Sequence, residues 1–281
     1  MELKREKYLN EIIKRRNNHL IKVITGLRRS GKSYLLNILY KNHLLANGVK
    51  ESHIISFSFD NLEDIMKLDV YLPNEPTLFY DSKHNYLVNP KKFILFIGDL
   101  TKEDANYNLL LDEIQLLDNF VIALNGLLSH DNFDIYVTGS NSKMLSKDII
   151  TEFRGRGDQI HVYPLSFKEF YSYSNKSFDD AYLEYQYYGG MPYLINLDTD
   201  ERKQEYLKQL FSEIYIKDIT ERNGIKDIKS FENLLCVLSS SIGSYTNPTN
   251  LENTFKSVEK IIYGHVTIKN HIEFIKDAFL I

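Results

Sequence analysis

Tryptophan is absent from this sequence of 281 residues, and cysteine occurs once, at Cys236. With no second cysteine the chain cannot form an internal disulfide, which favours a reducing compartment such as the cytoplasm. The residues around the thiol are all apolar: Leu234, Leu235, Val237 and Leu238. An apolar surrounding of this kind predicts a buried structural thiol rather than a nucleophile.

Long apolar runs and a large excess of one charge are also missing. No run approaches the roughly 20 apolar residues of a membrane span, and the charged N-terminus lacks the apolar centre of a signal peptide. We therefore expect a soluble cytoplasmic protein with no membrane partner. The formal net charge of -4 gives no overall attraction to nucleic acid. A basic cluster, Lys14, Arg15 and Arg16, could contact phosphates of a ligand or nucleic acid, although a solvated helix face explains it more simply.

The clearest positive signal is a phosphate-binding loop between an apolar strand and a helix. Gly26, Gly31, Lys32 and Ser33 fill every fixed position of the pattern G-x-x-x-x-G-K-[ST]. The glycines permit backbone angles that a Cβ would block, and the turn aims its N–H groups inward as an anion cradle. The lysine reaches the β- and γ-phosphates, and the serine hydroxyl binds Mg²⁺. The expected nucleotide-binding residues are Gly26, Leu27, Arg28, Arg29, Ser30, Gly31, Lys32, Ser33 and Tyr34.

Strand and helix signals alternate along the chain as far as Pro164. Apolar stretches predict strands at Leu20–Thr25, His53–Asp60, Asn106–Leu111, Phe133–Thr138 and Gln159–Tyr163. Helices are expected at Glu2–Arg16, Tyr34–Ala46, Asn61–Leu68, Leu116–Leu128 and Ser142–Phe153. The stretch 69–89 shows no regular pattern, and Lys91–Gly98 fits a strand or a helix. Such alternation predicts parallel βαβ crossovers in a doubly wound α/β sheet. After Pro164 the sequence predicts helices only.

A second motif, LLLDEIQ, places Asp112 and Glu113 at the end of a buried strand. The carboxyl ends of parallel strands form the ligand-binding edge of such a sheet. We expect Asp112 to hold Mg²⁺, because this hard cation prefers oxygen ligands. Glu113 is the candidate general base that polarises the attacking water. This acid pair favours attack by water over transfer to a bound acceptor, for which no binding signature is visible.

One signal of guanine recognition lies at the wrong place in the chain. Thr101–Asp104, TKED, fits the [N/T]-K-x-D pattern of GTPases, but it precedes the Asp112 strand. A GTPase places this motif well after a D-x-x-G switch, and no D-x-x-G lies between Ser33 and Thr101. We interpret TKED as a solvated loop and expect adenine as the base.

Small polar residues at the end of the strand Phe133–Thr138 are candidates for contact with the γ-phosphate. Thr138, Ser140 and Asn141 could position the attacking water as a sensor residue does, or could form a turn and a helix cap. The sequence does not show which of the three residues acts as the sensor. Asn141 is included among the catalytic candidates.

Two arginines follow in the Gly-rich turn FRGRG. Arg154 or Arg156 could neutralise charge in the transition state, in cis or across a subunit boundary, and Arg156 is preferred. The alternative is an ion pair with a surface acid such as Asp158.

The motifs GLRRSGKS, LLLDEIQ, VTGSNS and FRGRG, the last running into PLSFKEF, resemble a prokaryotic family of AAA+-type ATPases related to the STAND NTPases. This resemblance implies a parallel sheet with the order 5-1-4-3-2, its five strands counted along the chain, and a helical lid after the sheet. It also implies that the turn Gly190-Met191-Pro192 packs on adenine, which adds Pro192 to the nucleotide-binding residues. Without the resemblance, this turn only ends one helix and starts another.

The tail of the chain resembles a winged helix. Its helices would be Ile228–Ile242, Asn247–Ser257 and Thr267–Ile281, the last equivalent to the helix that enters a DNA groove. The exposed face of that helix mixes charges, at Lys269, Asn270, Glu273, Lys276 and Asp277. Mixed charge attracts phosphate weakly, so a packing or partner role is favoured over DNA binding.

The expected organisation has three parts: an ATP-binding α/β domain over 1–164, a helical lid over 165–226 and a winged-helix-like segment over 227–281. In the family, the chain continues into a nuclease-like fold. Because this chain ends at Ile281 within an apolar run, it is expected to be truncated.

The expected function is hydrolysis of ATP with Mg²⁺, which would move the lid against the sheet. The main alternative is a nucleotide-gated, STAND-like switch that recruits protein or DNA while hydrolysis is slow or incidental. A weaker one is a DNA-binding regulator with an accessory ATPase. The expected partners are ATP and an unidentified protein or a second copy of the chain, with weak support for DNA.

Overall fold

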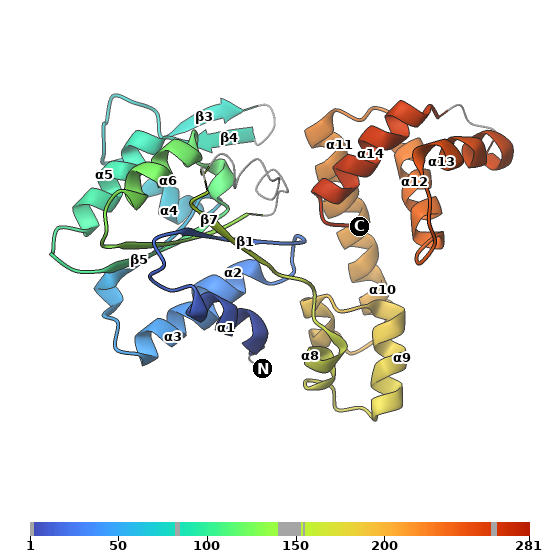
Figure 1. Ribbon diagram of the computed structural model, residues 1–281, viewed down its shortest axis with the longest axis horizontal. Helices are drawn as coiled ribbons and strands as arrows, with labels where there is room; N and C mark the ends of the chain where they lie inside the picture. Colours follow the sequence, from blue (N-terminus) through green and yellow to red (C-terminus); the bar gives the residue numbers. More distant parts are fainter. Residues whose placement is uncertain (1–2, 82–84, 140–152, 154, 260–262) are drawn as a thin grey trace. The chain divides into compact units, whose positions relative to one another are not determined.

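A five-stranded parallel sheet in the order β2-β5-β6-β1-β7 organises the first part of the chain (Figure 1). The computed structural model describes residues 3–81, 85–139, 153, 155–259 and 263–281. The strands are β1 (Ile21–Thr25), β2 (Ile54–Ser58), β5 (Tyr107–Asp112), β6 (Phe133–Thr138) and β7 (Gly157–His161). Counted along the chain as strands one to five, they give the order 5-1-4-3-2, so the expected order is confirmed.

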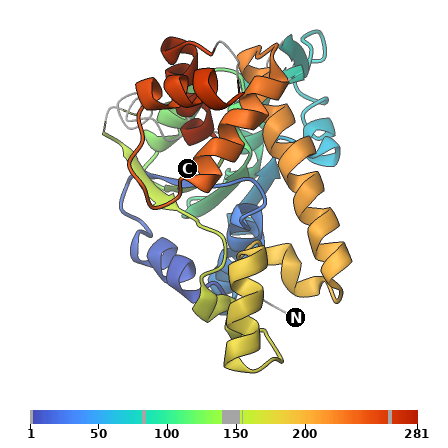
Figure 2. The ribbon, with the colours of Figure 1, turned by 90° about the vertical axis from the view of Figure 1, so that its right-hand side faces the viewer.

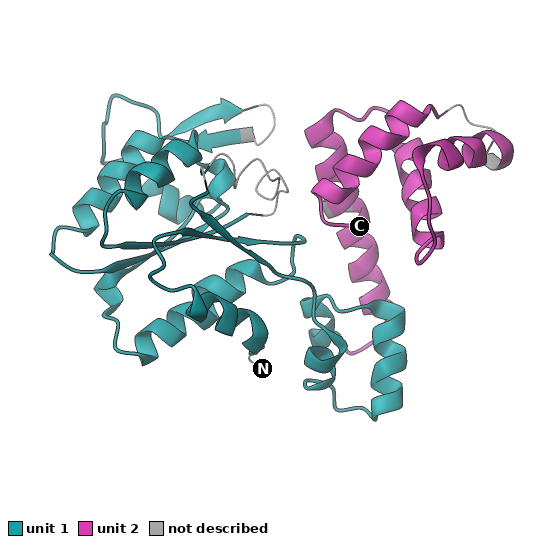
Figure 3. Cartoon of the chain, in the orientation of Figure 1, with its two compact units in different colours: residues 1–197 teal, residues 198–281 magenta. Residues whose placement is uncertain are grey.

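The chain divides into two compact units, residues 1–197 and residues 198–281 (Figure 3). Each unit is described by itself. The division into 1–164, 165–226 and 227–281 stays a prediction from the sequence.

Helices cover both faces of the sheet in the first unit (Figure 1). They are α1 (Glu6–Lys14), α2 (Lys32–Tyr34), α3 (Lys41–Ala46), α4 (Leu62–Met66), α5 (Pro90–Leu100) and α6 (Phe120–Leu128). Two more helices, α8 (Phe167–Tyr171) and α9 (Phe178–Tyr188), follow the sheet and pack on each other. A π-helical segment, Leu35–Tyr40, joins α2 to α3 without a break. Short 3-10 turns lie at Glu51–His53, Ile114–Leu116 and Pro192–Asn196.

Alternate side chains of each strand enter two separate hydrophobic cores. Leu109 and Leu111 of β5 pack with α5 and α6, whereas Leu110 packs with α1 and the helix after the loop. This alternation follows from the two-residue period of a strand. All six residues of β5 and of β6 are buried, as is typical of parallel strands covered on both faces.

Two stretches without a clear pattern in the sequence have regular structure. The stretch 69–89 contains an antiparallel hairpin, β3 (Leu78–Asp81) and β4 (Asn85–Val88), so the expectation of irregular structure is wrong there. Each strand has only four residues, β3 is largely exposed and β4 buries Val88 in the core, so no clear alternation marks them in the sequence. The ambiguous stretch Lys91–Gly98 lies in α5, where Asn89 caps the first turn and Pro90 is the first residue.

A buried ion pair crosses the amino half of the sheet. Lys22 is fully buried, and its ammonium group contacts the carboxylate of Asp134. Tyr136 donates a hydrogen bond to the same carboxylate at 2.7 Å, and Tyr40 donates to Tyr136 at 2.5 Å. The charges of Lys22 and Asp134 therefore compensate each other within the core, as burial of charge requires.

The second unit is helical. Its elements are α10 (Asp200–Gln209), a π segment (Leu210–Ile216), α11 (Lys217–Asn223), α12 (Ile228–Ser240), α13 (Pro248–Thr254) with the π segment Phe255–Glu259, and α14 (His265–Asp277). The first three form one continuous rod, light orange in Figure 2. Ile268 and Ile275 of α14 enter a core with Phe231 and Leu234 of α12. The charged face expected on α14 is exposed, but the likeness to a winged helix stays a prediction.

Cys236 is exposed, so the expectation of a buried thiol is wrong. The core face of α12 contains Phe231, Leu234 and Leu235, which follow the helical period of three and four residues. Cys236 lies off that face even though its sequence neighbours are apolar.

Among the helices of the described residues, none has the length and apolar character that crossing a membrane requires.

Replacement of Gly26 by alanine should disrupt the first unit at the end of β1. Gly26 has φ +137°, and a Cβ there would lie 2.1 Å from the carbonyl oxygen of Val162. We expect Gly26→Ala to lower the free energy of unfolding by about 3 kcal/mol, since backbone must move to admit the methyl group. Gly98→Ala is the matched control, because a Cβ in that helix meets nothing within 4 Å. Equal unfolding midpoints in urea for the two variants would contradict this packing.

Candidate functional site

The phosphate-loop motif leaves β1 at the carboxyl edge of the sheet. Gly26 packs against the backbone of Val162, just after β7, at an approach that no Cβ allows. Arg29 and Gly31 both have positive φ, 64° and 95°. Such left-handed residues within a turn orient successive N–H groups toward one point, which is the geometry of an anion-binding nest. The exposed side chains of Arg28 and Arg29 lie on the outside of this turn.

Lys32 opens the helix and is almost fully buried. Its ammonium group donates hydrogen bonds to the carbonyls of Gly26 and Leu27, each at 3.0 Å. Burial lowers the pKa of Lys32, and the nearby carboxylates of Glu113 and Asp112 oppose that change. The cation is thus held by the loop itself, in a place where negative charge stabilises it.

Asp112 links the loop helix to the two central strands. Its carboxylate accepts hydrogen bonds from Ser33 at 3.1 Å, from Asn37 at 3.3 Å and from Thr138. Burial raises the pKa of this carboxyl group, while the bonds from Thr138 and Ser33 lower it. Every one of these hydrogen-bond donors is neutral, so the buried charge lacks an ion-pair partner among the described residues.

Glu113 follows in a strained backbone conformation. Its φ of 51° is left-handed, which is uncommon for a residue with a side chain. The N–H of Glu113 donates to the hydroxyl of Thr138 at 3.2 Å, and Gln115 donates to the Glu113 carboxylate. Strain of this kind persists where neighbouring contacts hold it, often at functional sites. Gln115 is a positioning residue that the motif contained without revealing its role.

The donor set around Asp112 fits Mg²⁺. Ser33 and Asp112 offer a hydroxyl and a carboxylate oxygen 3.1 Å apart, and both are hard oxygen ligands. The carboxylate is buried with neutral partners and lies beside a second acid, Glu113. A divalent cation would offset both charges.

A buried arginine outside every motif ties the loop to the segment after the sheet. Arg5 donates to the carbonyl of Ser30 at 3.2 Å and to the carbonyl of Tyr163 at 2.6 Å. Its guanidinium also lies 3.2 Å from the carboxylate of Glu169, on α8. Sequence reasoning missed Arg5, because its partners lie up to 164 positions away in the chain and no local pattern predicts them.

His161 is a second residue near the loop that the sequence did not reveal. It ends β7 directly beside Thr25, the last residue of β1. Burial lowers the pKa of His161, and the charge of Lys32 lowers it further. Both effects favour the neutral form of the imidazole beside the loop.

Pro192 lies near the loop within the first unit. A Cβ built on Gly31 would be 4.0 Å from the ring of Pro192. The preceding Gly190 fits tightly against Leu165, whose N–H donates to the Gly190 carbonyl at 2.7 Å. A side chain at Gly190 would collide with the Leu165 carbonyl oxygen at 2.1 Å, so this turn is fixed in place.

The structure does not bring Arg156 to the loop. Arg156 precedes β7, and its carbonyl accepts a hydrogen bond from the N–H of Ile21 at the start of β1. It therefore lies at the amino edge of the sheet, whereas the loop lies at the carboxyl edge. Its role in the transition state stays a prediction, and Asp158, the acid considered as its partner, pairs with Arg15. Ser140, Asn141, Arg154 and nearly all of the helix expected at Ser142–Phe153 lie outside the described residues.

The TKED stretch also lies at the amino edge. Residues 101–104 link the end of α5 to the start of β5, and three of the four are exposed. A base held at the carboxyl edge is out of reach of this loop, which agrees with its interpretation as a solvated connection.

Family models match both parts of the chain. A model described as an AAA domain matches residues 18–171, which contain the loop, Asp112 and Glu113. A domain of unknown function, DUF8612, matches residues 179–281.

Two curated relatives match nearly the whole chain. An uncharacterized protein of Haemophilus influenzae is 31% identical over 284 residues, covering 99% of this chain and 65% of the relative. An uncharacterized protein of Methanocaldococcus jannaschii is 29% identical over 280 residues, covering 93% of this chain and 55% of the relative. The chain thus spans less than two thirds of the length of either relative.

The solved structures that resemble the chain are distant. The ORC2 protein of Aeropyrum pernix has a TM-score of 0.47 and 13% identity, covering 98% of this chain and 85% of that one. AMPPCP-bound DnaA of Aquifex aeolicus has a TM-score of 0.41 and 15% identity, covering 100% of this chain and 90% of that one. Neither likeness is close enough to support an inference about function.

Removal of the Thr138 hydroxyl should affect both stability and any nucleotide turnover. Thr138→Val deletes a donor to Asp112 and an acceptor for Glu113, so we expect a loss of about 1–3 kcal/mol in the free energy of unfolding. Turnover should fall by about 10–100-fold, as for other groups that orient metal ligands. Thr220→Val is the control, since this buried threonine bonds only within its helix. Thr138→Val turnover equal to that of Thr220→Val would contradict the positioning role.

Proposed function

The chain belongs to the AAA domain family, and on that premise we propose that it binds ATP with Mg²⁺ and hydrolyses it at the loop Gly26–Ser33. The observation that carries the proposal is the hydrogen bond between Ser33 and Asp112, 3.1 Å long. It joins a phosphate-loop serine to an acid at the end of β5, two strands away from β1, at the edge where such sheets bind ligands. A phosphate loop paired with a carboxylate in this way supports a nucleoside triphosphate as the substrate.

Binding would be performed by the loop and the start of its helix. The N–H groups from Leu27 to Ser33 converge on the phosphates, and the helix dipole favours their charge. Lys32 would exchange its two carbonyl partners for phosphate oxygens, which are stronger partners for an ammonium group. Ser33 and Asp112 would hold Mg²⁺, which neutralises charge on the phosphates when it is bound.

Hydrolysis would depend on Glu113. Its carboxylate is held by Gln115 and its backbone by Thr138, so the group is fixed beside Asp112. A carboxylate in this place can accept a proton from water as it attacks the γ-phosphorus. Asn141 and Arg154 remain candidates for orienting that water and for stabilising the transition state, and Arg156 could serve a neighbouring copy of the chain.

The turn that contains Pro192 is the proposed contact for adenine. Its closeness to Gly31 supports this role, because the base must lie next to the loop that holds the phosphates. Through this turn, the state of the nucleotide would reach the helices that follow.

A nucleotide-gated switch is the second candidate. Pro192 near the loop and the tie from Arg5 to Glu169 favour it, since both connect the loop to the segment after the sheet. In a switch, a non-hydrolysable ATP analogue would promote binding of a protein or a second copy as well as ATP does. In a motor-like ATPase, the analogue would arrest the cycle instead.

DNA is the weaker partner, because the exposed face of α14 mixes acids with lysines.

Replacement of Glu113 by glutamine should separate binding from turnover. We expect Glu113→Gln to retain ATP binding, because the phosphate loop and Lys32 are unchanged. Release of phosphate should fall by about 10²–10⁴-fold, because the amide accepts no proton. Filter binding of labelled ATP and a phosphate-release assay measure the two properties.

Glu103→Gln is the matched control, since this exposed acid lies at the other edge of the sheet. Unchanged phosphate release in Glu113→Gln would rule out Glu113 as the base. Wild-type protein that binds ATP and releases no phosphate would leave the switch as the function.

A further inference from the structure

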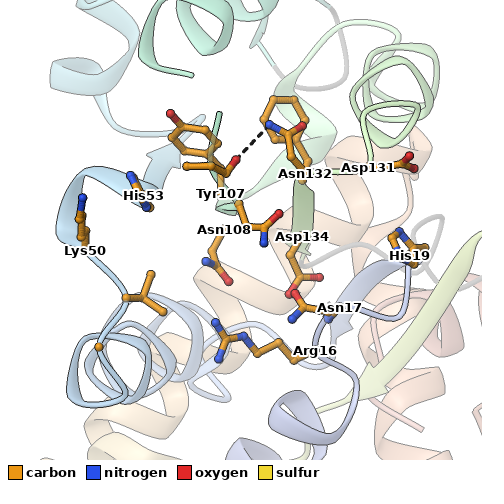
Figure 4. Close-up of a pocket in the computed structure, with 15 residues that line it drawn as sticks. Arg16, Asn17, His19, Lys50, His53, Tyr107, Asn108, Asp131, Asn132 and Asp134 are labelled. Carbon is orange, nitrogen blue, oxygen red and sulfur yellow. Dashed lines mark hydrogen bonds between the residues drawn. The ribbon is translucent and has the colours of Figure 1, made fainter. Parts of the chain in front are cut away.

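A cavity of about 550 Å³ opens at the amino edge of the sheet, opposite the phosphate loop (Figure 4). Its walls are the segment between α1 and β1, the link from α3 to β2, and the first residues of β5 and β6. Its volume lies within the range of small-molecule sites. Polar and basic side chains dominate the lining, among them Arg16, Lys50, His53, Asn108 and Asn132.

Two polar atoms in this lining are buried and have no hydrogen-bond partner among the residues that the structure describes. The side-chain carbonyl oxygen of Asn108 accepts no bond, although Asn108 is only 3% exposed. The Nε of Arg16 is also buried and donates to nothing. Figure 4 shows both side chains turned into the cavity. An unsatisfied buried polar atom destabilises the fold, so an acceptor and a donor left open in one cavity indicate a ligand that satisfies both.

Two other polar side chains of the lining, Asn132 and Asp134, already have partners. Asn132 donates to the carbonyl of Ala105 at 3.1 Å, the bond drawn in Figure 4. Asp134 is neutralised by Lys22 and accepts a hydrogen bond from the N–H of Asn17 at 3.1 Å. The buried atoms of the lining that can still form a hydrogen bond are therefore the side-chain oxygen of Asn108 and the Nε of Arg16.

The charge of the cavity favours an anion. Arg16 and Lys50 are cationic, while His53 in the lining lies 3.4 Å from the carboxylate of Glu103, an exposed acid outside the cavity. Of the two acids in the lining, Asp134 is paired within the core and Asp131 is exposed at the rim. Arg16 has no ion-pair partner among the described residues, and a guanidinium group suits the planar recognition of phosphate oxygens.

We propose that this cavity binds a small phosphate ester with free hydroxyl groups. The guanidinium of Arg16 contacts the phosphate with help from Lys50, and the Asn108 carbonyl accepts a hydrogen bond from a hydroxyl. The site is separate from the nucleotide site. Asn108 and Asp112 are four residues apart on β5, so they lie about 13 Å apart along the strand. This inference does not depend on ATP hydrolysis at the loop.

Calorimetric titration of the full chain with three probes tests the proposal. Ribose 5-phosphate has both groups, whereas ribose has only hydroxyls and inorganic phosphate only the anion. Ribose 5-phosphate should bind at least about tenfold more tightly than either, since loss of one charged or buried hydrogen bond costs that much. No heat from ribose 5-phosphate at millimolar concentration, or equal affinity for inorganic phosphate, would overturn the proposal.

Four variants locate the binding. Asn108→Leu and Arg16→Met should each weaken ribose 5-phosphate by about tenfold or more. Lys14→Met, at an exposed lysine of the same basic cluster, should leave binding unchanged. Lys32→Ala should also leave it unchanged, because Lys32 lies in the phosphate loop. Binding lost with Lys32→Ala and kept with Arg16→Met would overturn the proposal and assign the ester to the loop.

A thermal melt distinguishes binding from folding. Asn108→Leu removes an unsatisfied amide from the core, so its melting temperature should equal or exceed that of the wild type. If Asn108→Leu fails to fold, Arg16→Met decides the question, because its methionine keeps the apolar stem without the charge. Arg16→Met that folds and binds ribose 5-phosphate with wild-type affinity contradicts the proposal.

Discussion

The buried carboxylate of Asp112 is the contact on which the arrangement of the first unit depends. It accepts hydrogen bonds from Ser33 and Asn37 on the helix after the loop, and from Thr138 on β6. The loop, β5 and β6 are thereby held at one edge of the sheet. All three donors are neutral, and burial raises the pKa of the group, with the charges of Glu113 and Asp60 adding to that rise. A buried carboxylate that is oriented by neutral donors can bind a cation.

The two edges of the sheet have different chemistry. The carboxyl edge concentrates acids beside a phosphate loop, and Arg5 ties that loop to Tyr163 and Glu169 beyond the sheet. The amino edge has a basic cavity in which Asn108 and Arg16 leave polar atoms without partners. The same strands reach both edges, since β5 starts at the cavity and ends at Asp112. A parallel sheet can thus hold two polar sites that share no residue.

Much of this arrangement follows from the sequence, and the failures have physical causes. β6 begins and ends where the run Phe133–Thr138 predicts, because a strand covered on both faces is mostly apolar, and its one acid is paired within the core. The sequence did not show that Arg156 lies at the amino edge of the sheet, because closeness to the sensor stretch in the chain says nothing about the end of β7 at which it stands. Arg5 and the cavity around Asn108 had no signal at all, since both arise from segments far apart in the chain. The exposure of Cys236 followed from helical period rather than from the polarity of its neighbours.

Hydrogen exchange with and without ATP and Mg²⁺ tests the central claim most directly, because it locates bound nucleotide on the backbone. The account predicts slower exchange at the amides from Leu27 to Leu35 and near Glu113, with no change around Asn108. Protection that needs Mg²⁺ and disappears in Lys32→Ala would agree with the proposed ligands. Exchange at the loop that ATP leaves unaltered, or protection confined to the amino edge, would contradict the assignment of the loop as the nucleotide site.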